Sequence, residues 1–232
     1  ASQSNGFESD NNADGSTAEP FTTATFSNMT FLGPKVFDKN FQNTKEYING
    51  DKMNPGNGSS LGLFQAAMHI RRNSRLNCYN SVVAGWPVGI ILDNEKGDTQ
   101  GAASKGLLKL HRIVMAGMDI TGSDFNKIYK DELYDYKTKT TDPSKKSFSS
   151  TFFLLQDNGN KLLDNWLAST WSGVESIISA STTLGGNLQG SFSDLQSNNW
   201  FDKSATYVGA FRNAADNWMS GWTNFDPENT KY

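Results

Sequence analysis

The chain has few of the residues that build metal centres and disulfide frameworks, and it has no long apolar run. Of its 232 residues one is cysteine, Cys78, and two are histidine, His69 and His111. A single cysteine excludes an intrachain disulfide, and the zinc patterns that need several Cys or His residues are absent. No apolar run approaches the roughly 20 residues of a membrane-spanning helix. The opening segment ASQSNGFESDNN has neither a signal-peptide nor a lipidation pattern.

Charge is also scarce. Charged residues make up 19% of the chain, and the formal net charge is −3. This balance gives no general attraction to nucleic acid or anionic membranes, so no nucleic-acid partner is expected. No Gly-rich phosphate loop, nucleophile elbow or Ser-His-Asp arrangement is recognisable.

What the chain does contain is a repeated strand-like decapeptide that ends on glycine. The copies are Ala24–Gly33 (ATFSNMTFLG), Leu76–Gly85 (LNCYNSVVAG) and Leu108–Gly117 (LKLHRIVMAG). Aligned by column, apolar and polar residues alternate over the first four positions, as in a strand with one buried face. Cys78 falls in an apolar column, which predicts a small buried side chain.

The fifth column, with Asn28, Asn80 and Arg112, breaks this alternation, and the residues after it are apolar without a gap. We expect a corner there that turns the chain onto a second face, with the stacked asparagines hydrogen-bonded to the strands above and below. Ala67–Asn73 and Val88–Asp93 are expected to be further strands.

A repeat of single strands predicts an all-β fold, a right-handed single-stranded parallel β-helix of the pectate-lyase-like kind. We expect three faces, an N-terminal end that is incomplete, and a partly helical, irregular C-terminal cap. Residues 1–118 would form the stacked strands, with a loop insertion near 35–62 that is rich in Gly, Pro, Asn and Ser. Residues 119–232 would form an irregular insertion and the cap of the same domain.

Several segments resemble a group of secreted or surface-anchored parallel β-helix proteins of Bacteroidetes, whose activity is mostly undetermined. They are Asn5–Gly15 (NGFESDNNADG), Ala24–Pro34 (ATFSNMTFLGP), Met68–Ser74 (MHIRRNS), Gly85–Asp93 (GWPVGIILD) and Tyr207–Tyr232 (YVGAF…W…GWTNFDPENTKY). Residues 119 to about 200 fit the group poorly. The resemblance implies the β-helix fold and an extracellular or outer-membrane surface location.

In that group, further strands precede the segment that corresponds to Gly6–Asn11. We therefore expect another polypeptide to cover the N-terminal end of the stack, either the protein's own N-terminal half or a subunit of an outer-membrane complex.

Asp10-Asn11-Asn12-Ala13-Asp14-Gly15 has the order of a calcium loop, in which oxygen side chains at alternate positions bind a hard cation. Asp10, Asn12 and Asp14 are the predicted ligands. The twelfth position, where a bidentate Glu is usual, falls on Phe21. An Asx-rich turn without an ion is the alternative.

Four arginines, Arg71, Arg72, Arg75 and Arg112, could form a basic stripe that binds carboxylated sugars. The alternative is a solvated face on which they pair with Asp and Glu of neighbouring strands. Both histidines are expected to be surface or hydrogen-bonded strand residues.

Aromatic residues are plentiful, with five of the six tryptophans in the last third of the chain. Sugar-stacking platforms are one explanation, and packing in the expected cap is the favoured one. Lys161–Ser169 is expected to be helical.

Two function classes stay open. The favoured one is a non-enzymatic secreted or cell-surface module, either an accessory or structural subunit of an outer-membrane assembly or a binder of glycans or protein. The other is a polysaccharide lyase or glycoside hydrolase with its site partly on preceding strands. Such enzymes need paired carboxylates, or a base beside a calcium-bound uronate. The outward columns of the repeat hold no acidic pair.

Overall fold

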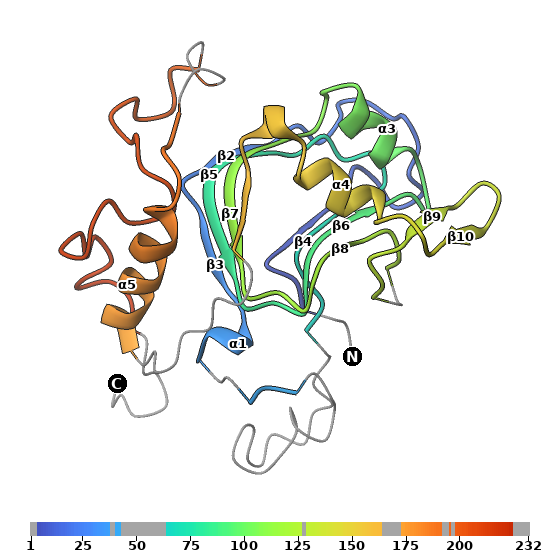
Figure 1. Cartoon of the computed structure of the whole chain (residues 1–232). Helices are drawn as coiled ribbons and strands as arrows, with labels where there is room; N and C mark the ends of the chain where they lie inside the picture. Colours follow the sequence, from blue (N-terminus) through green and yellow to red (C-terminus); the bar gives the residue numbers. More distant parts are fainter. Residues whose placement is uncertain are drawn as a thin grey trace, which may run out of the picture.

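The computed structural model describes residues 4–37, 40–42, 64–126, 129–163, 173–191, 195 and 198–224. Its centre consists of two parallel sheets, and from β3 to β8 successive strands along the chain lie alternately in one and the other (Figure 1). The four-stranded sheet has the order β1 (Phe7–Ser9), β4 (Ala66–Arg71), β6 (Val88–Asp93), β8 (Ile120–Ser123). The five-stranded sheet has the order β11 (Lys161–Leu163), β7 (Lys109–Ala116), β5 (Asn77–Ala84), β2 (Thr25–Ser27), with β3 (Thr30–Leu32) also paired to β5.

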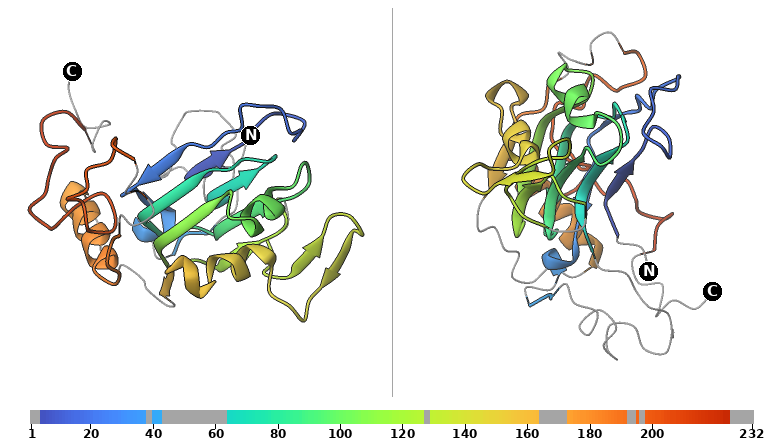
Figure 2. Two further views of the ribbon diagram at one scale, coloured as in Figure 1. Left: turned by 90° about the horizontal axis from the view of Figure 1, so that it is seen from above. Right: turned by 90° about the vertical axis from the view of Figure 1, so that its right-hand side faces the viewer.

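The connections between strands contain α1 (Pro34–Phe37), α3 (Thr99–Ser104), α4 (Phe148–Phe153) and the 3-10 turn η1 (Gln156–Asn158). Helix α5 (Gly173–Gly185) follows the last described strand, β11. An antiparallel hairpin of β9 (Leu133–Asp135) and β10 (Thr140–Asp142) projects beyond the sheets (Figure 2).

The expectation of an all-β, single-stranded parallel β-helix with three faces is wrong. The described residues form two parallel sheets together with helices, which is a mixed α and parallel-β architecture. The connections became part of the fold because they carry apolar side chains of their own. Phe152 and Phe153 of α4 are buried in the core, and Leu184 of α5 is buried against the five-stranded sheet.

Within the part expected to form an insertion and a cap, α4 packs against β8 at the end of the four-stranded sheet, whereas α5 does not cover the end of the stack. Helix α5 packs against β5 and β7, on the outer face of the five-stranded sheet (Figure 1). Of the segment expected to be helical, Lys161–Leu163 is the strand β11, and 164–169 lie outside the described residues. Most of the expected loop insertion, 43–62, lies outside them too.

The register of the repeat is confirmed. Phe26 pairs with Cys78, and Cys78 pairs with Leu110, so the three decapeptides stack column on column. The expected strands over Ala67–Asn73 and Val88–Asp93 are also found, as β4 and β6.

The fifth column bends the strands without turning them onto a new face. Asn28, Asn80 and Arg112 all have left-handed backbone conformations, with φ of 57°, 48° and 57°. One left-handed residue within a strand shifts the alternation by one position. In β5, Cys78 and Val83 lie on either side of Asn80 and both face the core. They are an odd number of positions apart, so a regular strand would place them on opposite faces.

The shift explains the unbroken apolar run after each bend. Val83 packs in the core between the sheets, whereas Val82 and Ala84 pack outward against Leu184 and Val208 of the C-terminal part. Both faces of this half of the strand are buried, so both require apolar side chains.

The side chains of the fifth column, Asn28, Asn80 and Arg112, form hydrogen bonds with the C-terminal segment. Asn28 Nδ2 donates to the Tyr207 carbonyl at 2.6 Å. Asn80 donates to the Ser191 carbonyl at 3.1 Å and accepts from its amide at 3.0 Å. Arg112 donates to the Gln189 carbonyl at 3.3 Å. These bonds hold Gln189, Ser191 and Tyr207 on the outside of the five-stranded sheet.

Glycine ends each decapeptide because the chain turns sharply there. Gly85 and Gly117 have φ of 70° and 65°, a conformation that side chains disfavour. Gly33 lies directly against the Gly85 carbonyl, where a Cβ atom would collide.

At the N-terminal end of the sheets, the outermost strands among the described residues are β1 in one sheet and β2 and β3, which both pair with β5, in the other. The rings of Phe7, Phe26 and Phe31 meet there, with centroids 4.6 to 4.8 Å apart. The polypeptide expected to cover this end stays a prediction. No helix among the described residues is long and apolar enough to cross a membrane.

Candidate functional site

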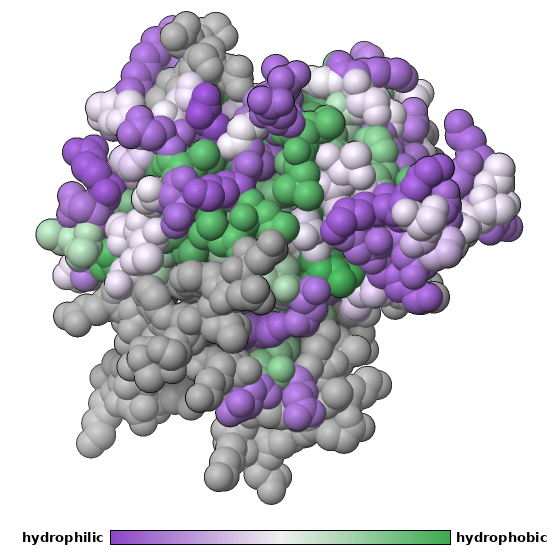
Figure 3. Space-filling model, in the orientation of Figure 1, coloured by the Kyte–Doolittle hydropathy of each residue, from purple (hydrophilic) through white to green (hydrophobic). Residues whose placement is uncertain are grey.

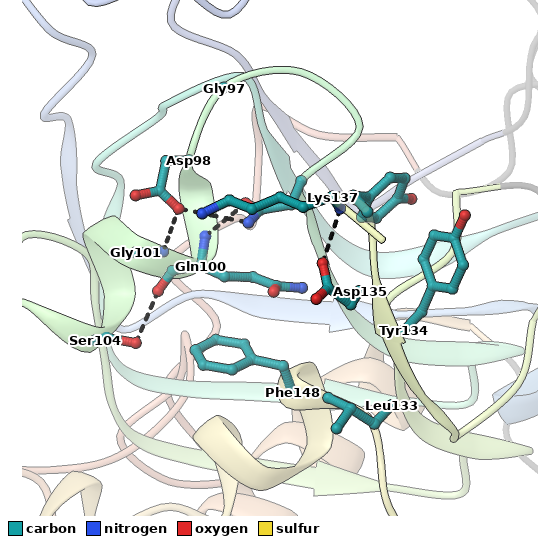
Figure 4. A pocket seen from close by; sticks show the side chains of 12 residues that line it. Gly97, Asp98, Gln100, Gly101, Ser104, Leu133, Tyr134, Asp135, Lys137 and Phe148 are labelled. Carbon is teal, nitrogen blue, oxygen red and sulfur yellow. Dashed lines mark hydrogen bonds between the residues drawn. The ribbon is translucent and has the colours of Figure 1, made fainter. Parts of the chain in front are cut away.

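A cleft of about 520 Å³ lies between the Asn94–Ser104 segment, the β9–β10 hairpin and the start of α4. Figure 4 shows its lining side chains, which come from three separate parts of the chain. Aromatic rings and hydrogen-bonding groups both line it. The rings are Tyr134, Tyr136 and Phe148, and the polar groups include Asp98, Gln100, Asp135 and Lys137.

One wall of the cleft is fixed by the cap of α3. Asp98 precedes the helix and its carboxylate accepts a hydrogen bond from the Gly101 amide at 3.1 Å. A Cβ atom at Gly101 would collide with this carboxylate, so a larger residue there would displace the cap. Two hydrogen bonds hold Gln100: its backbone N–H donates to Asn94 Oδ1 and its side-chain Nε2 donates to the Leu92 carbonyl, both at 2.9 Å.

The opposite wall is the β9–β10 hairpin. Asp135 accepts from the backbone amides of Lys137 at 2.8 Å and Thr138 at 3.4 Å, which closes the turn. The Lys137 hydrogen bond is the main cause of a lowered pKa for Asp135. Its carboxylate is therefore ionised at neutral pH.

A buried carboxylate joins the hairpin to α4. Asp124 accepts from the amides of Tyr134 at 3.2 Å, Phe148 at 2.8 Å and Ser149 at 3.0 Å. Tyr134 and Phe148 are both cleft residues, so one side chain sets the spacing between two walls. Burial raises the pKa of Asp124 despite these hydrogen bonds.

Beneath the cleft lies a charged network on the outer face of the four-stranded sheet. His69 Nε2 lies 3.4 Å from Asp93 Oδ2, and both side chains are almost fully buried. Asp93 also accepts from the Glu95 amide at 2.6 Å and from Asn126 Nδ2 at 3.1 Å. Burial alone would raise the pKa of Asp93, but these hydrogen bonds outweigh it and the pKa is lowered.

Tyr136 connects this network to the cleft. Its hydroxyl donates to the Asp124 carbonyl at 2.9 Å, and its ring contacts Tyr134 with centroids 4.7 Å apart. Burial, and then the charge of nearby Asp93, raises the pKa of Tyr136. The tyrosine is therefore neutral and fixed in position.

The four arginines predicted to bind glycans do not form a stripe. Arg71 lies 3.4 Å from both Glu8 and Asp10, and Arg72 donates to Asp10 at 2.7 Å. These two match the alternative explanation, pairing with acidic residues of a neighbouring strand. Arg75 stacks on the Phe21 ring at 3.4 Å, and Arg112 binds the C-terminal segment on the other sheet.

The predicted calcium ligands lie close together but have other partners. Asp10 faces the two guanidinium groups of Arg71 and Arg72. Asn12 and Asp14 both accept from the Ser16 amide, at 3.0 and 2.9 Å. Among the described residues, no three His, Cys, Asp or Glu side chains are grouped to hold a metal ion. Calcium binding stays a prediction, and a melting temperature that is the same with calcium and with chelator would exclude it.

The histidines are the strand residues expected, one buried in β4 and one half-buried in β7. His111 contacts the Tyr79 ring with centroids 5.7 Å apart. Burial in a core does not account for the three described tryptophans of the last third: Trp200 is 94% exposed, Trp218 49% and Trp222 68%. Trp166 and Trp171 lie outside the described residues.

No protein-family model, curated protein or solved structure matches the chain. The resemblance to Bacteroidetes surface proteins therefore stays a prediction.

Sequence reasoning missed the cleft because its residues lie within 94–148, largely beyond the repeat. One signal was present: Tyr134 and Tyr136 are two apart around Asp135, so in a strand both rings fall on one face. That pattern indicates an aromatic surface, though it does not identify the opposite wall.

Proposed function

We propose that this protein is a non-catalytic, secreted or cell-surface binder of neutral glycans, and that the cleft between α3 and the β9–β10 hairpin is its binding site. The observation that carries the proposal is the lining of the cleft, which combines aromatic residues with fixed hydrogen-bond acceptors. Sugar rings have an apolar face that packs on aromatic rings and a rim of hydroxyls that donate to carboxylates and amides.

The charges of the cleft favour a neutral sugar. Asp98 and Asp135 line it together with a single cation, Lys137. A uronic acid would meet an excess of negative charge, and like charges in one site oppose binding. Of the arginines first expected to bind carboxylated sugars, Arg71 and Arg72 are paired with Glu8 and Asp10.

Hydrolysis is less well supported than binding. A glycoside hydrolase needs a carboxylic acid that stays protonated to donate to the leaving group. Asp135 is held ionised by backbone donors, and the Asp98 carboxylate is occupied by its helix cap. Asp124 has a raised pKa, but it is completely buried and bonded to the backbone.

Retention in gels that contain soluble neutral polysaccharides tests the proposal, with a panel of β-glucans, xylan and mannan beside uronic-acid polymers. Two substitutions of Tyr134 distinguish the contribution of its aromatic ring to binding from that of its hydroxyl. We expect Tyr134→Ala to weaken binding about tenfold, equivalent to about 1.4 kcal/mol, and Tyr134→Phe to retain most of it.

Circular dichroism melts would show that both variants are folded. Equal retention of Tyr134→Ala and wild type would contradict the assignment of the cleft. Release of new reducing ends from any polysaccharide of the panel would replace binding with hydrolysis as the function.

A further inference from the structure

A row of three aromatic rings runs from the interior to the surface of the C-terminal part. Phe211 stacks on Trp218 with centroids 5.8 Å apart and an angle of 25°, and Trp218 contacts Trp222 at 5.6 Å and 33°. Exposure increases along the row, from 2% for Phe211 to 49% for Trp218 and 68% for Trp222. The inner end is anchored because Phe211 packs with Ile178 of α5 and with Met219.

The polar atoms of the two tryptophans are already bound inside the protein. Trp218 Nε1 donates to the Ala210 carbonyl at 2.8 Å, and Trp222 Nε1 donates to the Trp218 carbonyl at 2.9 Å. Each indole is therefore fixed by a hydrogen bond, although about half or more of each residue stays exposed. A rigid ring face loses little conformational entropy when a ligand packs on it.

We propose that Trp218 and Trp222 form a second saccharide-binding surface, on which pyranose rings of a polysaccharide stack. Exposed amide and hydroxyl side chains, Asn217 and Ser220, lie within the same segment and match sugar hydroxyls. The charges there, from Arg212 and Asp216, are one of each sign. A surface that binds anionic membranes carries an excess of Lys and Arg instead.

This surface is independent of the cleft. It belongs to residues 211–222 beside α5, whereas the cleft belongs to α3, the hairpin and α4, on the opposite side of the sheets (Figure 1). The two sites can therefore be tested separately, and a long polysaccharide that reached both would be held more tightly than by either one.

The experiment is a pull-down of the whole chain on insoluble cellulose, chitin and mannan, with neutral and anionic phospholipid vesicles as a second arm. Trp222→Ala removes the outermost ring, and Trp222→Phe restores an aromatic face. Trp200→Ala is the matched control, since Trp200 is a more exposed tryptophan outside the row. We expect Trp222→Ala to reduce retention on a polysaccharide about tenfold, Trp222→Phe to recover most of it, and Trp200→Ala to equal wild type.

Three results would overturn the proposal: no polysaccharide retained through Trp222, an equal loss in Trp200→Ala, or binding to vesicles alone. Tyr134→Ala is measured in parallel. A loss confined to Tyr134→Ala would leave the cleft as the binding site and refute the second surface. A loss confined to Trp222→Ala would do the reverse.

Discussion

At the scale of single residues, the same backbone conformation recurs at one column of the repeat. Asn adopts the left-handed region more readily than most residues, which suits Asn28 and Asn80, whereas Arg112 adopts it at a cost. The side chain of each contributes a hydrogen bond to the C-terminal segment. The sequence revealed the column but not the bend, because the break in alternation is equally compatible with a corner.

Cys78 illustrates a residue whose environment was predictable. It was placed in an apolar column, and it is completely buried between the sheets. Burial raises the pKa of its thiol to about 12. We expect no modification by a thiol reagent at pH 8 in the native protein and complete modification in denaturant, as counted by mass spectrometry. Stoichiometric labelling of the native protein would show that the core is open at this point.

Asp93 makes the stability of the fold depend on pH. Its pKa is lowered in the folded state, so its ionised form stabilises the protein above the unfolded value of about 3.9. That contribution disappears as the pH falls through the folded pKa. We expect Asp93→Asn to lower the free energy of unfolding by about 2 kcal/mol at pH 7, and the difference from wild type to shrink below about pH 4.

Urea denaturation at pH 7, 5 and 3 measures both effects. A difference that stays constant over this range would mean that the Asp93 charge does not contribute to the fold.

At the scale of elements, the strands with a period-two pattern were predictable and the helices were not. β4 and β6 were placed from their sequences. α4 has only six residues, FSSTFF, and its position depends on Ser147 and on Asp124, which lies 24 residues before its first residue. No local sequence pattern predicts a hydrogen bond between residues so far apart in the chain.

The junction between α4 and the hairpin makes a prediction. Asp124→Ala removes the acceptor of three backbone amides, and buried donors without partners are costly. We expect a loss of about 3 kcal/mol and faster hydrogen exchange at Tyr134, Phe148 and Ser149. Asp142→Ala is the control: this half-exposed aspartate of the same hairpin accepts from the Ser144 amide and hydroxyl at the surface, and its loss should destabilise the protein much less. Similar effects of the two substitutions would contradict the role of Asp124.

At the scale of the whole molecule, two sheets provide a rigid support and the connections provide the surfaces. On the face of Figure 3, hydrophobic area is visible over the middle, where in Figure 1 the segment from α4 to β11 crosses in front of the five-stranded sheet. Leu154 and Leu155 of this segment are 44% and 49% exposed. Hydrophilic residues cover the right-hand side of the same view, over the hairpin, and also its left and upper edges.

The cleft could not be read from sequence spacing, since its walls begin at Asn94, Leu133 and Phe148 and meet only through the fold. The repeat predicted which residues stack, and this was correct. It did not predict how many faces the strands form, because that number depends on how the intervening segments pack. The β-helix expectation was wrong for this reason.

Glycan binding in the cleft is best tested by hydrogen–deuterium exchange with and without the neutral oligosaccharide that corresponds to the best-retained polysaccharide. We expect slower exchange in the two cleft walls, Asn94–Ser104 and Leu133–Lys137, and a loss of this protection in Tyr134→Ala. Unchanged exchange in both walls at saturating oligosaccharide would show that the cleft does not bind the glycan.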